Sequence, residues 1–397
     1  MSSLVNLYPA YDLSPLAGLL LLAALLALGP VLWVWLNHRQ GRRHQRQHAL
    51  RVLTLFLTFD LVVFGAFTRL SDSGLGCPDW PGCYGQLSPL GAANQITAAE
   101  IAQPEGPVTH AKAWIEMAHR YLAMAVGALI TWLAALAWRD WWRQRALPQA
   151  LARQTPWPWL ATLTLVWVCV QGAFGALTVS LRLYPAIVTL HLLGALVLLI
   201  MLATQVVHGD TQASRRVLSK GTRRHVQMAL GLLLVQVALG GWVSANYAVL
   251  ACTEFPTCQG RWWPEMDLRE GFGIWHEPGR SGSGAYLSLA GLTAIHVVHR
   301  LMAVVVTGVL LALAWRLHRS PSWRKLARLL VALLGVQLAT GVSTVVLGWP
   351  LWAALIHTGG ASALVLTLTW IAASRTWQAA AVATAAPPGM HRFGAQP

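Results

Sequence analysis

Charged residues are scarce in this chain of 397 residues, of which Asp, Glu, Lys and Arg make up only 11%. A soluble domain has about 25% charged residues, so the shortage argues against a soluble protein. Hydrophobic residues make up 56% of the chain, and its mean hydropathy is +0.51. Apolar runs of the roughly 17–25 residues that span a bilayer begin near residues 16, 50, 112, 158, 186, 226, 288, 325 and 351. The pattern predicts an all-α integral membrane protein with nine transmembrane helices.

Acidic residues are fewer than basic ones, 14 against 29, which gives a formal net charge of +15. Such a charge can indicate a nucleic-acid partner, but its distribution argues against one. The basic residues gather at 39–51, 139–153, 215–224 and 316–328, which are every second loop, whereas most acids lie in the loops between. Cytoplasmic loops of membrane proteins carry this excess of Lys and Arg. The charge therefore predicts topology, with the N-terminus outside and the C-terminus in the cytoplasm.

Cysteines are also few, five in all, and four of them lie in two similar loop sequences. The sequence CPDWPGCYGQLSP occupies residues 77–89, and CTEFPTCQGRWWP occupies residues 252–264. The matching cysteines are Cys77, Cys83, Cys252 and Cys258. Both loops fall on the predicted outer face, where the environment permits disulfides.

Three interpretations of the cysteine loops are open. The spacing suits a tight loop closed by a Cys77–Cys83 or Cys252–Cys258 disulfide, although sequence alone does not prove pairing. A metal site would need more thiolate or imidazole ligands than each loop has, and a thiol oxidoreductase would favour a closer Cys-x-x-Cys pair. We interpret the fifth cysteine, Cys169, as an inert packing residue within an apolar helix.

The repeat extends well beyond the cysteine loops. WIEMAHRYLAMAVG (114–127) matches AIHVVHRLMAVVVTG (294–308), and a segment beginning VQGAF (170–174) matches one beginning VQLAT (336–340). The chain therefore divides into two four-helix units, at about 50–210 and 225–375. Residues 1–49 add an extra N-terminal transmembrane helix and a basic cytoplasmic loop outside the repeat, and 376–397 form a cytoplasmic tail.

Four histidines lie inside the predicted helices at repeat-related places: His119, His191, His299 and His357. Ionisable groups inside a bilayer are costly and rare, so they are read first as functional. At about 1.5 Å per residue, each lies roughly 10 Å below the outer surface. Two imidazoles at equal depth on facing helices suit the axial positions of one haem. The alternatives are neutral imidazoles hydrogen-bonded across helices, or a zinc or copper site, which would want further ligands nearby.

One chemical difference separates the two units. Glu116 lies three residues before His119 on the same helix face, whereas His296 takes the matching place in the second unit. A carboxylate in the bilayer beside only one of two haems suggests that the units do different jobs. The alternative is a structural ion pair with Arg120, Arg69 or Lys112.

Three arginines lie near the outer face, where haem propionates would be found: Arg69, Arg120 and Arg300. They are candidate propionate partners, and each could instead extend to lipid headgroups. Ser244 replaces Arg69 in the second repeat.

The ordered combination of GAFTRLSDSGLGCPDWPGC, WIEMAHR, the helical His191, AIHVVHR and LIHTGGA resembles the heme A synthase family. The resemblance covers about residues 50–375, so the extra helix of residues 1–49 is a departure from it. It implies two pseudo-twofold-related four-helix bundles that convert haem O into haem A by oxidising a ring methyl group to a formyl group.

The resemblance also implies a role for each site residue. In the N-terminal unit, His119 and His191 would ligate the substrate haem O, and Glu116 would be the catalytic acid. In the C-terminal unit, His299 and His357 would ligate a permanent haem b. Family members of this type also carry cysteine pairs in their outer loops.

The setting implied by the resemblance is the bacterial cytoplasmic (inner) membrane, where terminal oxidases are assembled. Its partners would be the lipid bilayer and a haem O synthase that supplies the substrate, with no nucleic acid; a homo-oligomer is an open alternative. A competing function is a two-haem, b-type membrane protein that oxidises quinol, which would tolerate the loss of Glu116. A transporter would want a polar, broken-helix path across the whole membrane, and the inner halves of these helices are apolar.

Overall fold

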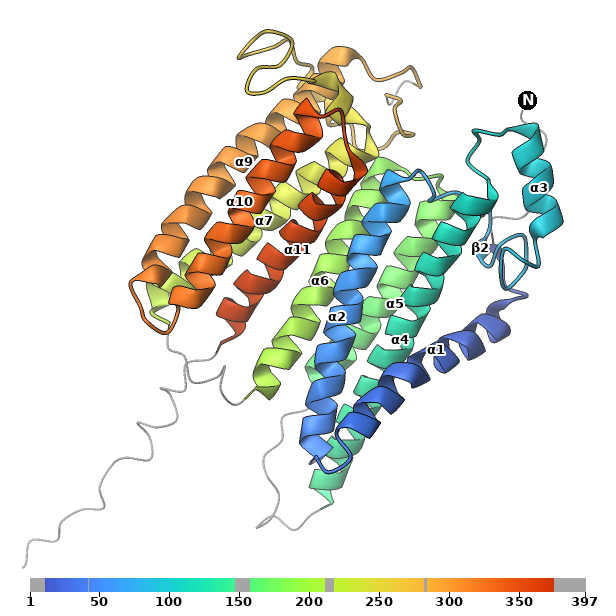
Figure 1. The fold of residues 1–397 in the computed structure, drawn as a ribbon, viewed down its shortest axis with the longest axis vertical. Coiled ribbons are helices and arrows are strands. Elements are labelled where there is room, and N and C mark those ends of the chain that lie inside the picture. Colours follow the sequence, from blue (N-terminus) through green and yellow to red (C-terminus); the bar gives the residue numbers. More distant parts are fainter. Residues whose placement is uncertain (1–10, 42, 147–157, 211–217, 282–283, 375–397) are drawn as a thin grey trace, which may run out of the picture.

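The computed structural model describes residues 11–41, 43–146, 158–210, 218–281 and 284–374 (Figure 1). Within them, nine helices are long and apolar enough to cross a membrane. These are α1 (Leu16–Asn37), α2 (Arg43–Leu70), α4 (His110–Arg145), α5 (Trp159–Ser180), α6 (Pro185–Gly209), α7 (Lys220–Ala245), α9 (Leu289–His318), α10 (Arg324–Val346) and α11 (Leu351–Ala373). The prediction of an all-α integral membrane protein is confirmed. The proposed tail, 376–397, lies outside the described residues.

The two four-helix units pack in the same way. Helices α2, α4, α5 and α6 contact one another in turn, and α7, α9, α10 and α11 repeat that order (Figure 1). Helix α6 also contacts α7 and α11, and α11 contacts α2, so α2, α6, α7 and α11 form the seam between the units. Helices of a membrane protein associate through close packing rather than through exclusion of water. Along this seam and on its second-unit side, Leu199, Leu313, Val365 and Leu368 are completely buried in one apolar cluster.

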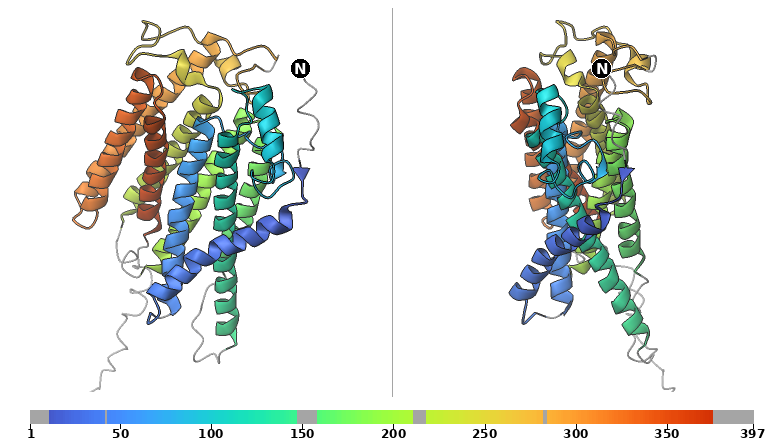
Figure 2. Two further views of the ribbon diagram at one scale, coloured as in Figure 1. Left: turned by 45° about the vertical axis from the view of Figure 1, so that its right-hand side comes forward. Right: turned by 90° about the vertical axis from the view of Figure 1, so that its right-hand side faces the viewer.

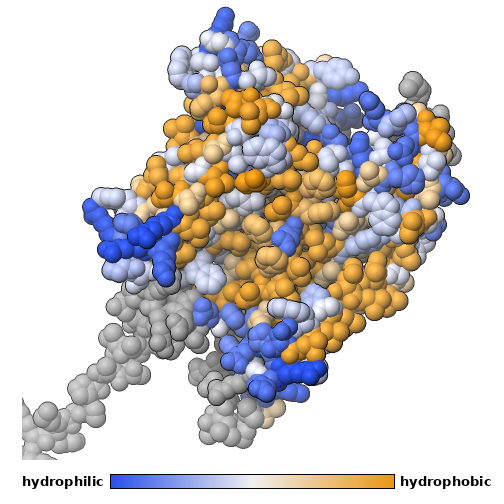
Figure 3. Space-filling view, viewed as in Figure 1, coloured by the Kyte–Doolittle hydropathy of each residue, from blue (hydrophilic) through white to orange (hydrophobic). Residues whose placement is uncertain are grey.

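The surface carries an apolar band with hydrophilic residues gathered towards its two ends (Figure 3). The cysteine loops lie at one end of the bundle, together with the short helices α3 (Ala93–Ala102) and α8 (Leu268–Gly271). Helix α1 begins at this end, and α11 finishes at the other, where α2 begins and α4 ends (Figure 1). This arrangement agrees with the alternation of basic and acidic loops in the sequence.

The extra helix α1 runs obliquely across the N-terminal unit and packs on α4 and α2 (Figure 2). Its residue Leu19 is fully buried in a cluster with the disulfide residues Cys77 and Cys83. Just before α1, strand β1 (Tyr11–Asp12) pairs in parallel with β2 (Trp80–Pro81), which lies inside the first cysteine loop. The segment predicted as an extra N-terminal transmembrane helix therefore also supports that loop.

Candidate functional site

The two cysteine loops have the same internal structure. Disulfides join Cys77 to Cys83 and Cys252 to Cys258, with S–S distances of 2.05 and 2.00 Å. In each loop an acid accepts hydrogen bonds from backbone N–H groups: Asp79 from Tyr84 and Gly85, and Glu254 from Gly260. Gly85 and Gly260 have φ angles of +71° and +72°, a conformation that favours glycine. The repeated Gly and acid thus close the same turn twice.

Matching arginines tie the loops to the helices that carry the histidines. Arg120 on α4 donates to the carbonyl groups of Asp79, at 2.9 Å, and Gly82. Arg300 on α9 donates to the carbonyl groups of Thr257, at 3.0 Å, and Glu254, at 2.9 Å. Both guanidinium groups therefore hold the loops in place. Binding of a haem propionate would be a further role for them.

Arg69, near the end of α2 that leads into the first cysteine loop, bridges the two units. It donates to the carbonyl oxygen of Ser244 at 2.7 Å and to Asp72 at 3.1 Å. The hydroxyl of Tyr247 donates to the same Asp72 oxygen at 2.7 Å, and partial burial raises the pKa of Tyr247, which keeps the donor protonated. Ser244 is the repeat counterpart of Arg69, and Tyr247 is that of Asp72. Residues at matching positions of the two units contact each other where the pseudo-twofold axis that relates the units passes.

Glu116 is buried, with 4% of its surface exposed, beneath the first cysteine loop. It accepts a hydrogen bond from the backbone N–H of Cys77 at 2.8 Å and forms an ion pair with Arg120. Of the three pairings that the sequence left open, the structure has the one with Arg120, since Lys112 donates to a loop carbonyl instead. At the matching place, His296 is 3% exposed and its Nδ1 has no hydrogen-bond partner in the described part of the chain.

Each of the four helical histidines lies against a glycine of the neighbouring helix. An added Cβ atom at the glycine would stand 2.9 to 3.6 Å from the imidazole ring. The pairs are His119 with Gly65, His191 with Gly175, His299 with Gly240, and His357 with Gly341. The glycines are themselves repeat counterparts. The sequence thus keeps the same space beside all four rings, as a planar cofactor between them would require.

The histidines also form one pair in each unit. His119 lies near His191, and His299 lies near His357. Phe64 of α2 lies nearly parallel to His119, with 6.3 Å between the ring centroids. No group of three or more His, Cys, Asp or Glu gathers as a metal-ion site among residues that the structure describes. Two separate imidazole pairs suit haem, whose iron needs only axial ligands from the protein.

The polar neighbours of the rings were not predicted from the sequence. In the second unit, the Gln236 amide nitrogen lies 3.1 Å from Nδ1 of His299, and the Thr340 hydroxyl oxygen lies 3.1 Å from Nδ1 of His357. The repeat alignment could have indicated both, because Leu61 and Phe174 stand at the matching places in the first unit.

Asp60 is a further residue that the sequence interpretation missed. It is a half-buried carboxylate within α2, one helical turn before Phe64, and Val235 replaces it in the second unit. A charged group within an apolar run is itself a signal of function.

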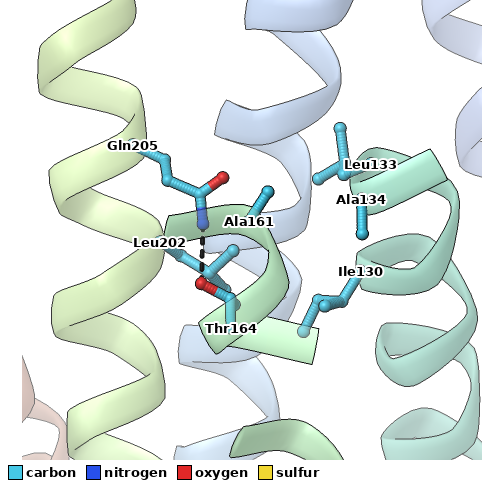
Figure 4. Close-up of a pocket in the computed structure, with 7 residues that line it drawn as sticks. All are labelled: Ile130, Leu133, Ala134, Ala161, Thr164, Leu202 and Gln205. Carbon is cyan, nitrogen blue, oxygen red and sulfur yellow. Dashed lines mark hydrogen bonds between the residues drawn. The ribbon is translucent and has the colours of Figure 1, made fainter. Parts of the chain in front are cut away.

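The cleft between α4, α5 and α6 has no histidine among its lining residues (Figure 4). It has no room for a water molecule, and one hydrogen bond crosses its wall, from the Gln205 amide to the Thr164 hydroxyl at 2.8 Å. Its other lining residues are apolar: Ile130, Leu133, Ala134, Ala161 and Leu202. With neither a histidine nor a charged group, this cleft is not the candidate site.

Comparison with known proteins agrees with this arrangement. The sequence model of the COX15-CtaA family, described as cytochrome oxidase assembly protein, matches residues 48–369. The chain belongs to this family. The COX15-CtaA match begins in α2 and ends in α11, so it includes both four-helix units and leaves α1 outside.

Three curated relatives carry the name heme A synthase. The protein of Shewanella oneidensis is 36% identical over 323 residues, which is 80% of this chain and 93% of that protein. That of Methylobacterium radiotolerans is 30% identical over 374 residues, 88% and 96% of the two chains. That of Halalkalibacterium halodurans is 27% identical over 318 residues, 77% and 89% of the two chains.

Peptide mapping without reduction should recover a Cys77–Cys83 link and a Cys252–Cys258 link. Cys169 should react with a lipid-soluble maleimide, because the structure leaves it free and exposed on α5; its interpretation as a packing residue was wrong. A cross-link between the two loops, or four free thiols in oxidised membranes, would contradict the loop structure.

Proposed function

We propose that this protein is a heme A synthase, which oxidises a ring methyl group of haem O to a formyl group and so provides haem A for terminal oxidases. The observation that carries the proposal is the pair of repeated, glycine-backed histidine sites with a buried carboxylate, Glu116, beside only one of them. Its membership of a cytochrome oxidase assembly family adds weight.

The two units take different haems in this proposal. His119 and His191 would hold haem O in the N-terminal unit, and His299 and His357 would hold a permanent haem b in the C-terminal unit. The carboxylate of Glu116 supports this division, because only a unit that performs chemistry needs a proton acceptor. When bound, the haems supply the redox chemistry and the relay of electrons.

Glu116 would handle the protons that oxidation of a methyl group releases. General acid–base groups act from within hydrogen-bond reach of the proton they move. The Cys77 N–H and the Arg120 guanidinium fix the carboxylate on the face of α4 that carries His119. The first cysteine loop, held by its disulfide, by Arg120 and by α1, would then cover the outer side of this site and exclude water.

The proposed setting is the bacterial cytoplasmic membrane, with the N-terminus outside and the cysteine loops on the same, oxidising side. The basic ends of the helices support this orientation. Haem O, which is apolar apart from its propionates, would reach the N-terminal unit from the haem O synthase that makes it.

Extraction of the haems from purified protein, followed by chromatography, tests the proposal. Haem b together with haem O or haem A is the expected result. Haem b alone, at two per chain, would instead identify an electron-transfer protein, for which the same four histidines would serve.

A further inference from the structure

The Thr340 hydroxyl on α10 makes hydrogen bonds of opposite sense. It lies 2.7 Å from the carbonyl oxygen of Val336 and 3.3 Å from that of Gln337, about one turn earlier in the helix, and 3.1 Å from Nδ1 of His357. A threonine within a helix gives its proton to such a carbonyl group. Because the hydroxyl has only one proton to donate, its oxygen must accept from the Nδ1–H of His357.

This contact selects one tautomer of the His357 ring. With the proton on Nδ1, the lone pair of Nε2 is free to bind iron. The backbone beside the ring is held as well, because the Gln337 amide donates to the carbonyl oxygen of His357 at 2.7 Å. A ligand histidine whose second nitrogen donates a hydrogen bond is both oriented and more basic.

The first unit lacks this contact. Phe174 stands at the place of Thr340, and Nδ1 of His191 is buried without a hydrogen-bond partner among the described residues. The glycine that backs each ring is the same in both units, Gly175 and Gly341. The shared glycine therefore does not account for the difference in the hydrogen bond to the ring.

We propose that Thr340 is a positioning residue that holds His357 ready to bind iron, and that Phe174 withholds this support from His191. The inference rests on the proposed function and deepens it. A ligand made more basic favours ferric iron and holds haem longer. The second unit would thus retain its haem, whereas the first would hold its haem loosely enough to accept a substrate and release a product.

The test replaces Thr340 by valine, which has nearly the same shape but no hydroxyl. In the purified, haem-loaded protein, Thr340→Val should speed the loss of haem b to added apomyoglobin by roughly tenfold and raise its midpoint potential. Thr340→Ser should behave as the parent protein does. Thr344→Val is the matched control, because the Thr344 hydroxyl is one turn further along α10 and donates to the Gly341 carbonyl at 2.7 Å.

The reciprocal variant, Phe174→Thr, gives His191 the missing acceptor and should slow the exchange of haem from the first unit. Unchanged haem loss and potential in Thr340→Val, or an equal change in Thr344→Val, would overturn the inference. A failure of the proposed function would look different, because the parent protein would then yield two haem b per chain and no haem O or haem A. If Thr340→Val does not fold, an unchanged exchange rate in Phe174→Thr overturns the inference by itself.

Discussion

Replacement of His299 or His357 by alanine should deplete haem b by more than about tenfold, since even the loss of a group that only orients a metal ligand costs 10–100-fold in affinity. Each change deletes one of the two axial ligands of the proposed permanent cofactor. The space that Gly240 and Gly341 keep beside these rings supplies no substitute ligand. Haem b is measured per chain by its absorption in pyridine after purification in detergent.

The repeat provides the matched control. His119→Ala and His191→Ala remove the corresponding ligands from the first unit, so they should keep haem b and lose bound haem O and haem A. Loss of haem b from His119→Ala, with His299→Ala unaffected, would show that the two units have exchanged roles.

The sequence predicted the membrane helices well because each is an apolar run bounded by charge. The predicted starts near 16, 325 and 351 lie within a residue of Leu16, Arg324 and Leu351. The start of α2 was placed near 50, but the helix begins at Arg43. Its first turns are basic, and a helix can continue beyond the bilayer wherever its residues are good helix formers. Hydropathy marks where a span enters the bilayer and not where the helix begins.

Short elements between the membrane helices, and side-chain contacts, were harder to predict. The ten residues of α3 form too short an apolar run to register as a span. The spacing of Glu116 and Arg120 permitted their ion pair, but the sequence allowed Arg69 and Lys112 as partners equally well. In the structure, Arg69 donates to the Ser244 carbonyl group and Lys112 to a loop carbonyl group. Contacts between different helices depend on rotation about each helix axis, which a sequence without an alignment does not specify.

Replacement of Glu116 by glutamine should lower the formation of haem A by roughly 10²–10⁴-fold, the usual contribution of a general acid–base group. Glutamine can still accept the hydrogen bond from the Cys77 N–H, while the charge is lost. The structure adds a second effect, because Arg120 is buried and depends on this carboxylate. Breaking a buried ion pair costs up to about 3–5 kcal/mol of stability, which the loop carbonyl groups around Arg120 should reduce.

Three variants separate catalysis from folding: Glu116→Gln, Arg120→Gln and the double variant. Haem A formation is measured per haem b, since haem b in the other unit reports the amount of folded protein. If Glu116 moves protons, Glu116→Gln and the double variant should both lose turnover, whereas Arg120→Gln should lose thermal stability and keep most of its turnover. If the carboxylate serves only the ion pair, the two single variants should be impaired alike. The double variant, with no unpaired charge left beneath the loop, should then recover haem A formation, and the catalytic role of Glu116 would be refuted.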